Sequence, residues 1–354
     1  MLIPPTNNVD REPGFPALFL GIGKGGIFHY RQLLPALAVG ADVATWDADA
    51  KGFVEMAKPV HDNPEVCVFQ MPVADDHLRI MLAMRKRGMK IVANVDDYIM
   101  NIRKQSDHHF TAHHFTKRVV ESHQRILTLS DAVIVSTQWL ADKLSRFNDN
   151  VFVCRNGLDL PRYEVHDTVD KAQDDKVIVG WAGGTGHKKA MQSISGELKT
   201  ALWENPQMLL VFVGEDFSYL FTELDASVRN RIAILPWSES LYDYPRALAG
   251  MDVALAPSDT SHFYAGKSQL RLYESGALNV PVIGGPRYTE IQHGVTGFRA
   301  VESGDWVKYI GELVQNDSLR KSMGQSLGDY VREYCSIEAR ASDWLSALES
   351  IRSL

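Results

Sequence analysis

The sequence is poor in cysteine and has no long hydrophobic run. Its three cysteines, Cys67, Cys154 and Cys335, are widely spaced and odd in number, so they form no metal-binding pattern and favour buried free thiols. No apolar run approaches the roughly 20 residues that a membrane span needs. The first residues also lack the basic region and apolar core of a signal peptide. We therefore expect a cytoplasmic protein without a transmembrane segment.

The composition is that of an ordinary globular protein, with 45% hydrophobic and 23% charged residues. A chain of 354 residues is too long for one comfortable core and suits two domains. The net charge is −7, yet residues 79–125 hold 10 Lys and Arg against 4 Asp and Glu. This segment is either a solvated helix face or a surface for an anionic partner.

Short apolar runs alternate with longer amphipathic runs along the whole chain, which is typical of parallel α/β units. A polar stretch at 164–176 reads as a linker between two such series. We therefore predict an α/β protein with two doubly wound, Rossmann-like domains, whose ligands bind beyond the carboxyl ends of the strands and in the cleft between the domains. The predicted strands are 17–23, 41–46, 66–71, 90–95, 132–136 and 151–154, then 177–183, 208–214, 232–237, 253–257 and 280–285. The predicted helices include 74–88, 111–129, 303–315, 317–334 and 336–352.

Two glycine-rich turns each join a predicted strand to a helix. In "GIGKGGIFHYRQLLPAL" (21–37), Gly25 and Gly26 can let a ligand approach the backbone. One interpretation is a dinucleotide site, in which Asp47 or Asp49 binds the ribose. The alternative is that the glycines serve packing alone. In "VGWAGGTGHKKAM" (179–191), open amides, a hydroxyl, cations and a helix start favour a diphosphate. The second turn does not match G-x-x-x-x-G-K-[ST], which excludes a P-loop. Its candidate ligand-binding residues are Gly183, Gly184, Thr185, His187, Lys188 and Lys189.

The stretch "GKSQLRLYESGALNVPVIGG" (266–285) carries a lone acid, Glu274. Lys267 precedes it by seven residues, so a continuous helix places both on roughly the same face. A carboxylate accepts hydrogen bonds from two vicinal hydroxyls, which suits Glu274 to a ribose and leaves a phosphate to Lys267. Ser268 belongs to the same candidate site. A surface salt-bridging helix is the alternative, but the neighbours of Glu274 are largely apolar.

Two further groups of polar residues lie in the first half. Asp96 and Asp97 follow a strand in "NVDDYIMN" and can bind a metal, act as a base, hold an acceptor hydroxyl or cap a helix. His109 and His113 are four apart in "DHHFTAHHF", a spacing that can hold zinc, although no third ligand is evident. A surface or acceptor-facing histidine cluster is the alternative, and we assign no metal site.

Several segments resemble the retaining glycosyltransferases with two Rossmann-like domains, the GT-B architecture of the group-one or family-four type. They occur in family order between residues 180 and 325. The segments are "GWAGGTGH", "LVFVGE", "MDVALAPSDTSHFYAGKSQLRLYESGALNVPVIGG", "EIQHGVTGFRA" and "LVQNDSLRKSMGQ". In the first half, "GGIFHYRQLLPAL", "VSTQWLADKL" and "VCRNGLDL" resemble the family's first glycine loop, the end of its first domain and its interdomain loop. The corresponding boundaries are an acceptor domain at 1–160, a donor domain at 161–335 and a C-terminal helix at 336–354 that packs back toward the first domain.

The resemblance implies roles for single residues. It makes Glu274 the glutamate that binds the nucleotide ribose, and Lys188 or Lys189 the lysine that grips the diphosphate above Gly183 and Gly184. It puts Pro236 and Trp237 beside the nucleobase and residues 262–266 in the loop that faces the donor sugar. In relatives a first-domain histidine or aspartate often faces that sugar, which makes His109 and Asp97 candidates.

This sequence departs from the family pattern at two places. Gly266 stands where the family's motif has an acid eight residues before Glu274, and Trp181 and Ala182 replace the arginine usually seen after the "VG" strand. These departures put the donor-sugar contact and the charge neutralisation of the leaving group in doubt.

The expected activity is transfer of a sugar from a nucleotide-diphosphate sugar, with UDP favoured, to an acceptor hydroxyl with retention of configuration. Fixed cations stabilise the departing diphosphate without a metal or other cofactor, and the candidate catalytic residues are Lys188, Lys267, Asp97 and His109. The acceptor can be a glycan, a small molecule, a protein or a modified base in DNA, and the basic segment 79–125 fits an anionic one. A sugar-nucleotide epimerase and a non-catalytic sugar-nucleotide binder are the alternatives.

Overall fold

The computed structural model describes residues 12–100, 115–164, 176–238, 240–258 and 261–354, and the chain forms two compact units. The first unit comprises Met1–Asp159, Ala265–Ser268 and Cys335–Leu354. The second comprises Leu160–Tyr264 and Gln269–Tyr334. No helix of the described ranges combines the length and the apolar character that crossing a membrane requires.

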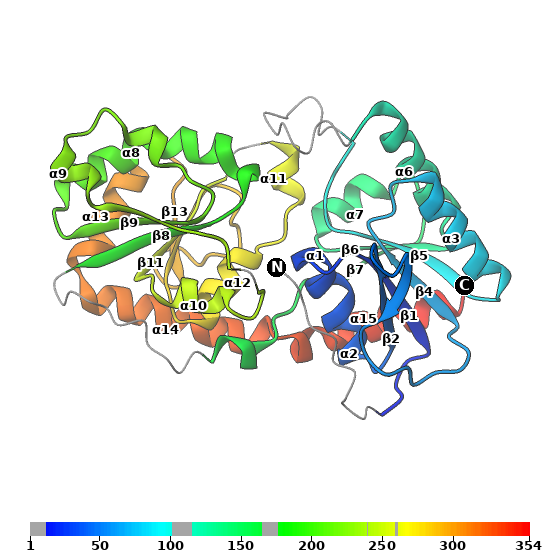
Figure 1. Ribbon diagram of the computed structural model, residues 1–354. Coiled ribbons are helices and arrows are strands. Elements are labelled where there is room, and N and C mark those ends of the chain that lie inside the picture. Colours follow the sequence, from blue (N-terminus) through cyan, green and yellow to red (C-terminus); the bar gives the residue numbers. More distant parts are fainter. Residues whose placement is uncertain (1–11, 101–114, 165–175, 239, 259–260) are drawn as a thin grey trace. The chain divides into compact units, whose positions relative to one another are not determined.

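The first unit is built on a seven-stranded sheet in the order β3-β2-β1-β4-β5-β6-β7, blue to cyan-green in Figure 1. Neighbouring strands are parallel except for the antiparallel pair β2 and β3. All six strands predicted in this half are confirmed. The sequence does not reveal the short edge strand β3, because three of its residues are half-buried, the fourth is exposed, and they show no apolar run. The strands are β1 (Ala17–Ile22), β2 (Asp42–Asp47), β3 (Gly52–Glu55), β4 (Val66–Gln70), β5 (Lys90–Val95), β6 (Ala132–Val135) and β7 (Val151–Val153).

Helices connect most of these strands, although none lies between β2 and β3 or between β3 and β4, a part of the chain that the structure describes in full. The last helix of the chain, α15, also belongs to this unit and packs against α2, β4 and β7. Its Trp344 is fully buried and lies 5.8 Å from the ring of Phe19, which anchors the helix on the sheet. Of the helix predicted at 111–129, residues 111–114 lie outside the described residues. The helix α6 begins at Lys117, because the Thr116 side chain accepts a hydrogen bond from the Val119 amide and caps it there. The helices are α1 (Gly26–Phe28), the π-helical turn η1 (His29–Leu33), α2 (Leu34–Ala38), α3 (Asp75–Lys86), α6 (Lys117–Leu129), α7 (Gln138–Leu144) and α15 (Ile337–Arg352).

The second unit is built on a six-stranded, wholly parallel sheet in the order β10-β9-β8-β11-β12-β13. Counted from β8, this is the 3-2-1-4-5-6 order of a Rossmann sheet, whose switch point lies between β8 and β11. The five strands predicted in this half are confirmed, and the further strand β13, Gly-Phe-Arg, shows no apolar run in the sequence. The strands are β8 (Val177–Gly183), β9 (Met208–Gly214), β10 (Ile232–Leu235), β11 (Val253–Ala256), β12 (Val282–Gly284) and β13 (Gly297–Arg299).

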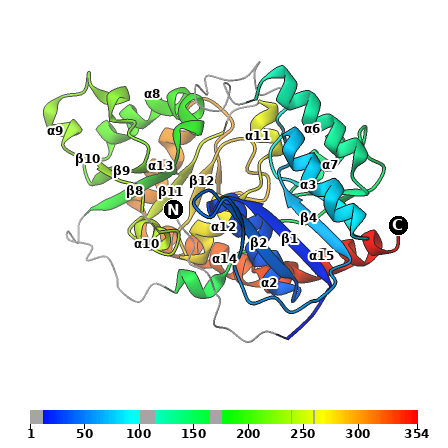
Figure 2. The same ribbon diagram turned by 45° about the vertical axis from the view of Figure 1, so that its right-hand side comes forward.

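Helices cover both faces of this sheet: α8 packs with α13, and α12 packs with α14 (Figure 2). One apolar core lies between the sheet and the α8–α13 layer, and it includes the fully buried Trp181 and Phe212. The helices predicted at 303–315, 317–334 and 336–352 are confirmed as α13, α14 and α15. The helices and turns of residues 160–334 are η2 (Leu160–Tyr163), η3 (Thr185–His187), α8 (Lys188–Glu204), η4 (Ser218–Phe221), α9 (Ala226–Arg229), α10 (Tyr244–Ala249), α11 (His262–Gly266, which crosses the boundary between the units), α12 (Leu270–Ala277), α13 (Asp305–Gln315) and α14 (Asp317–Tyr334).

Both sheets confirm the predicted α/β class with two Rossmann-like sheets. The parallel central strands read as continuous apolar runs because helices bury both of their faces, as in β4, where all five residues are buried.

Candidate functional site

The second glycine turn lies at the switch point of the second unit. Gly183 ends β8, the 3-10 turn η3 begins at Thr185, and α8 begins at Lys188. A methyl group on Gly183 would lie 2.5 Å from the Trp181 ring and 2.8 Å from Nη2 of Arg271, so only glycine fits. The turn therefore presents backbone and a helix start at the carboxyl end of the sheet, where such folds bind ligands.

Trp237 stands beside this glycine turn. It follows β10, and 44% of its surface is exposed. Gly214 ends β9 with φ of +100°, and a methyl group there would lie 2.5 Å from the indole, so glycine both permits this backbone and makes room for the ring. The indole also lies 3.8 Å from the Cβ position of Gly184. An exposed aromatic face next to open backbone suits a flat ring of a ligand.

Glu274 lies on α12 and is only 6% exposed. Burial and then the Glu274 carboxylate raise the pKa of Tyr244 well above its usual range, so the two side chains are electrostatic neighbours. The ring of Tyr244 in turn lies 6.2 Å from that of Trp237. Gly183, Gly184, Trp237 and Glu274, four candidates for one nucleotide site, are thus linked to one another through these contacts. Pro236 precedes the tryptophan and is exposed.

An arginine that belongs to no recognised sequence motif, Arg271, also reaches this turn. Arg271 lies one helical turn before Glu274, and its guanidinium carbon lies over the Trp181 ring, 5.5 Å from the ring centroid. Its Nη2 approaches Nε2 of His187 at 3.3 Å, and Nδ1 of His187 lies 2.6 Å from the Tyr264 hydroxyl. The only sequence signal was its i, i+3 spacing from Glu274, which puts both residues on one side of the helix.

The three lysines of the predicted site lie in different elements, two at the start of α8 and one before α12. Lys188 and Lys189 are exposed at the start of α8, and Nζ of Lys188 lies 5.8 Å from the centroid of the Tyr219 ring. The prediction that Lys267 shares a helical face with Glu274 is wrong, because α12 begins at Leu270. Gln269, with φ of −89° and ψ of 34°, departs from helical geometry and separates Lys267 from α12.

Lys267 instead belongs to the first unit, where its ammonium pairs with Oδ1 of Asp97 at 2.6 Å. The neighbouring Ser268 hydroxyl accepts a hydrogen bond of 2.9 Å from the Asn156 side chain. The carbonyl of Gly266 accepts one of 3.3 Å from Thr137. The segment Ala265–Ser268 is therefore fixed to the end of the first sheet by hydrogen bonds and an ion pair. The proposed contact of Lys267 with a phosphate stays a prediction.

Asp96 and Asp97 follow β5 in a polar cluster of the first unit. Burial, and then the neighbouring Asp97 carboxylate, raise the pKa of Asp96 to about 6, while Lys267 and Arg31 oppose this rise. Arg31 is only 1% exposed, and burial lowers its pKa to about 10 although Asp96 acts in the other direction. Its guanidinium donates to the side-chain oxygens of Asn94 and Asn156 and to the Cys154 carbonyl. The cluster thus holds two carboxyl groups and two cations at a strand end.

The first glycine turn, at Gly25 and Gly26, is open, since a methyl group at either residue would meet no atom within 4 Å. Asp47, weighed above as a ribose ligand, pairs with Lys24 of the same turn at 2.9 Å and accepts hydrogen bonds from the amides of Asp49 and Ala50. Asp47 therefore stabilises the loop that follows β2 and also pairs with the lysine of the glycine turn.

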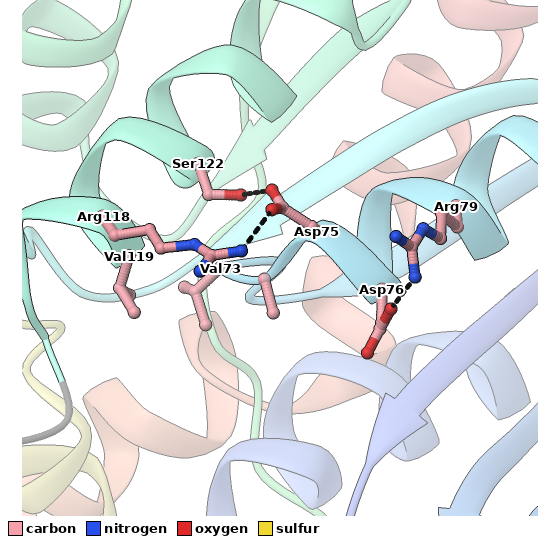
Figure 3. A pocket seen from close by; sticks show the side chains of 8 residues that line it. Val73, Asp75, Asp76, Arg79, Arg118, Val119 and Ser122 are labelled. Carbon is pink, nitrogen blue, oxygen red and sulfur yellow. Dashed lines mark hydrogen bonds and ion pairs between the residues drawn. The ribbon is translucent and has the colours of Figure 1, made fainter.

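The basic segment 79–125 is partly described. A pocket between the starts of α3 and α6 contains Arg79 and Arg118, which pair with Asp76 and Asp75 at 2.7 and 3.3 Å (Figure 3). The Ser122 hydroxyl also donates to Asp75, at 2.6 Å. Local carboxylates thus balance these cations, which favours the solvated helix face. His109 and His113 lie outside the described residues, and within the described ranges no three His, Cys, Asp or Glu side chains are grouped to hold a metal ion.

The three cysteines are free and buried, as predicted.

Comparisons with known proteins identify the fold. No family model and no curated protein matches the sequence. Among solved structures, HepE from Anabaena in complex with UDP-glucose is 14% identical, with a TM-score of 0.67 over 94% of this chain and 99% of that chain. Sucrose-phosphate synthase from Thermosynechococcus elongatus is 15% identical, with a TM-score of 0.68 over 96% and 99%. A glycosyltransferase from Rickettsia africae is 13% identical, with a TM-score of 0.61 over 95% and 98%. These similarities confirm that the chain has the GT-B fold predicted from the sequence.

Proposed function

We propose that this protein transfers a sugar from a nucleotide-diphosphate sugar to an acceptor hydroxyl. The observation that carries the proposal is that a glycine turn at the switch point of the second unit has an exposed indole beside it, and that one tyrosine, Tyr244, links this indole to a buried carboxylate. These three features suit the phosphates, the base and the ribose of one nucleotide. UDP is the favoured nucleotide, because HepE, which shares the fold, binds UDP-glucose.

Each part of the nucleotide has a proposed partner. The base stacks on Trp237 beside Pro236, because an exposed indole offers a large flat surface. The ribose hydroxyls donate to Glu274, whose charged carboxylate acts only as an acceptor. The diphosphate meets the amides of Gly183, Gly184 and Thr185 at the start of α8, where the helix dipole favours negative charge. The exposed Lys188 and Lys189 add positive charge at the edge of this phosphate site.

The difficult step is departure of the diphosphate, on which negative charge develops. Fixed donors and cations stabilise this charge most when they are already in place, so the reaction as proposed needs no metal. A chelator should therefore leave turnover unchanged, and restoration of chelator-sensitive activity by a divalent ion would contradict this part of the proposal. We further propose retention of configuration by displacement on one face of the sugar, which the anomeric signal of the product in NMR would test.

We propose that the first unit binds the acceptor. Asp97 and His109 are its candidate residues, and the partly buried carboxyl pair after β5 can accept a hydrogen bond from an acceptor hydroxyl. A glycan, a small molecule, a protein and a hydroxylated base in DNA are the candidate acceptors. DNA affinity that falls steeply with salt would support the last of these, and absence of DNA binding at low salt would exclude it.

Calorimetric titration with UDP, GDP and ADP tests the donor site. We expect one nucleotide to bind the wild type and the Glu274→Ala variant to lose that binding. Glu302→Ala is the matched control, because Glu302 is exposed before α13 in the same unit. Absence of binding by all three nucleotides, or equal affinity in E274A, would contradict the assignment.

Product analysis then separates the proposed transferase from the two other classes. Free nucleotide with a glycosylated acceptor supports the transferase. An isomerised sugar without acceptor product identifies an epimerase. A bound donor that no acceptor turns over identifies a non-catalytic binder.

A further inference from the structure

The Arg271 guanidinium occupies the glycine turn of the second unit, and no motif of the sequence assigned it a role. We infer that Arg271 binds the diphosphate of the donor and stabilises it as the leaving group. The inference rests on the proposed function, since it concerns the same nucleotide site.

The position of the guanidinium supports this role. Nη2 lies 2.8 Å from the position of a Cβ on Gly183, so the absence of a side chain there is what lets the arginine reach the end of β8. The guanidinium carbon lies over the Trp181 ring, 5.5 Å from its centroid, and this cation–π contact helps to hold the side chain at the turn. Nη1 is buried and has no hydrogen-bond acceptor within the described residues. A buried donor without an acceptor is costly, and a phosphate oxygen at the turn would satisfy it.

His187 and Tyr264 orient this arginine. A guanidinium only donates hydrogen bonds, so Nε2 of His187 must accept from Nη2 of Arg271 at 3.3 Å. This assigns the ring proton to Nδ1, which donates to the Tyr264 hydroxyl at 2.6 Å. His187 is therefore a positioning residue for Arg271.

Arg271 is better suited than the nearby lysines to this task. Lys188 and Lys189 are exposed, so water and salt weaken their attraction for a phosphate. Lys267 pairs with Asp97 in the first unit. Arg271 is half-buried, and its planar fork matches two oxygens of a phosphate at once, which a lysine ammonium cannot do.

The chemical role follows from the transfer itself. The bond between the anomeric carbon and the diphosphate oxygen breaks, and its electron pair stays on that oxygen. A new bond forms between the anomeric carbon and the acceptor oxygen, and the acceptor proton passes to the departing diphosphate. Arg271 stabilises the charge on the diphosphate while it develops, which lowers the barrier.

The test compares UDP with uridine, which lacks both phosphates, on the full-length protein. UDP affinity is measured by calorimetry and uridine affinity by ligand-observed NMR, or the corresponding GDP or ADP pair is used if the wild type prefers it. For Arg271→Met we expect UDP affinity to fall at least tenfold and uridine affinity to change less than twofold. Arg229→Met is the matched control, because Arg229 is exposed at the end of α9 in the same unit.

Arg271→Lys keeps the positive charge but loses the planar guanidinium that can bind two phosphate oxygens. It is the test variant if R271M does not fold. A selective loss of UDP affinity in R271K, smaller than that of a folded R271M, supports the inference. Unchanged UDP affinity in a folded R271M, or in R271K if R271M does not fold, overturns it. Equal losses for UDP and uridine also overturn it, because they indicate general damage to the site. A wild type that binds none of the three nucleotides instead contradicts the proposed function itself.

Discussion

Replacing Asp96 with asparagine should change how the stability of the first unit depends on pH. The Asp96 carboxyl group follows β5, and burial, with the adjacent Asp97 carboxylate, raises its pKa from 3.8 to about 6 in the folded chain. Asparagine has nearly the same shape but does not titrate. The substitution therefore removes the proton linkage of this one group and leaves the rest of the cluster in place.

The sign and size follow from the shift. Because the pKa is higher in the folded state, Asp96 adds stability that is complete below the unfolded pKa and is lost as the pH rises through about 6. A shift of about two pKa units corresponds to roughly 3 kcal/mol at most, of which roughly 2 to 3 kcal/mol falls between pH 4 and pH 8. The free energy of unfolding of D96N, compared with that of the wild type, should therefore rise by roughly 2 to 3 kcal/mol from pH 4 to pH 8.

Urea unfolding at pH 4, 6 and 8 measures the difference, and exchange of the β5 amides reports on the first unit by itself. Asp49→Asn, at an exposed position after β2, is the control for the change in net charge. A difference between D96N and the wild type that stays constant over this range would refute the reasoning. An equal pH dependence in D49N would assign the effect to net charge rather than to the buried carboxyl group.

Three other substitutions or treatments give direct tests. Gly183→Ala puts a methyl group 2.5 Å from the Trp181 ring, so thermal unfolding should show a loss of about 1 to 3 kcal/mol together with weaker nucleotide binding; an unchanged melting temperature would contradict the packing. Gly266→Glu introduces the acid that the family motif has. Its Cβ would lie 3.2 to 3.4 Å from three side chains of the first unit, so we expect a lower melting temperature. A gain in turnover with an unchanged melting temperature would contradict this expectation. Burial raises the pKa of Cys67 and of Cys154 to about 12, so iodoacetamide at pH 8 should leave both unmodified until urea unfolds the chain; rapid labelling of the folded protein would show that they are accessible.

The fold was predictable because its signals are local. A parallel strand covered on both faces must be apolar throughout, and the turn that follows it must bend sharply, so runs such as 208–214 and glycines such as Gly183 appear directly in the sequence. The same local signals predicted the glycine turn after β8. Glu274 was a candidate because of its carboxylate chemistry and the family resemblance, and its role stays a prediction. The sequence does not reveal strands β3 and β13, because GFVE and GFR each contain a glycine and a charged residue and show no continuous apolar run.

The sequence by itself therefore determined the two Rossmann-like sheets, the turn at the end of β8 and the acid on α12. Only the tertiary structure decided which cations meet which acids. Lys267 and Glu274 are seven residues apart, yet the break before Leu270 leaves Lys267 paired with Asp97, 170 positions earlier in the chain. Arg271 had no motif, and its role became visible only when Trp181, Gly183 and His187 were brought around it. The physical reason is that periodicity reports which face of an element is buried, whereas an ion pair depends on where separate elements meet.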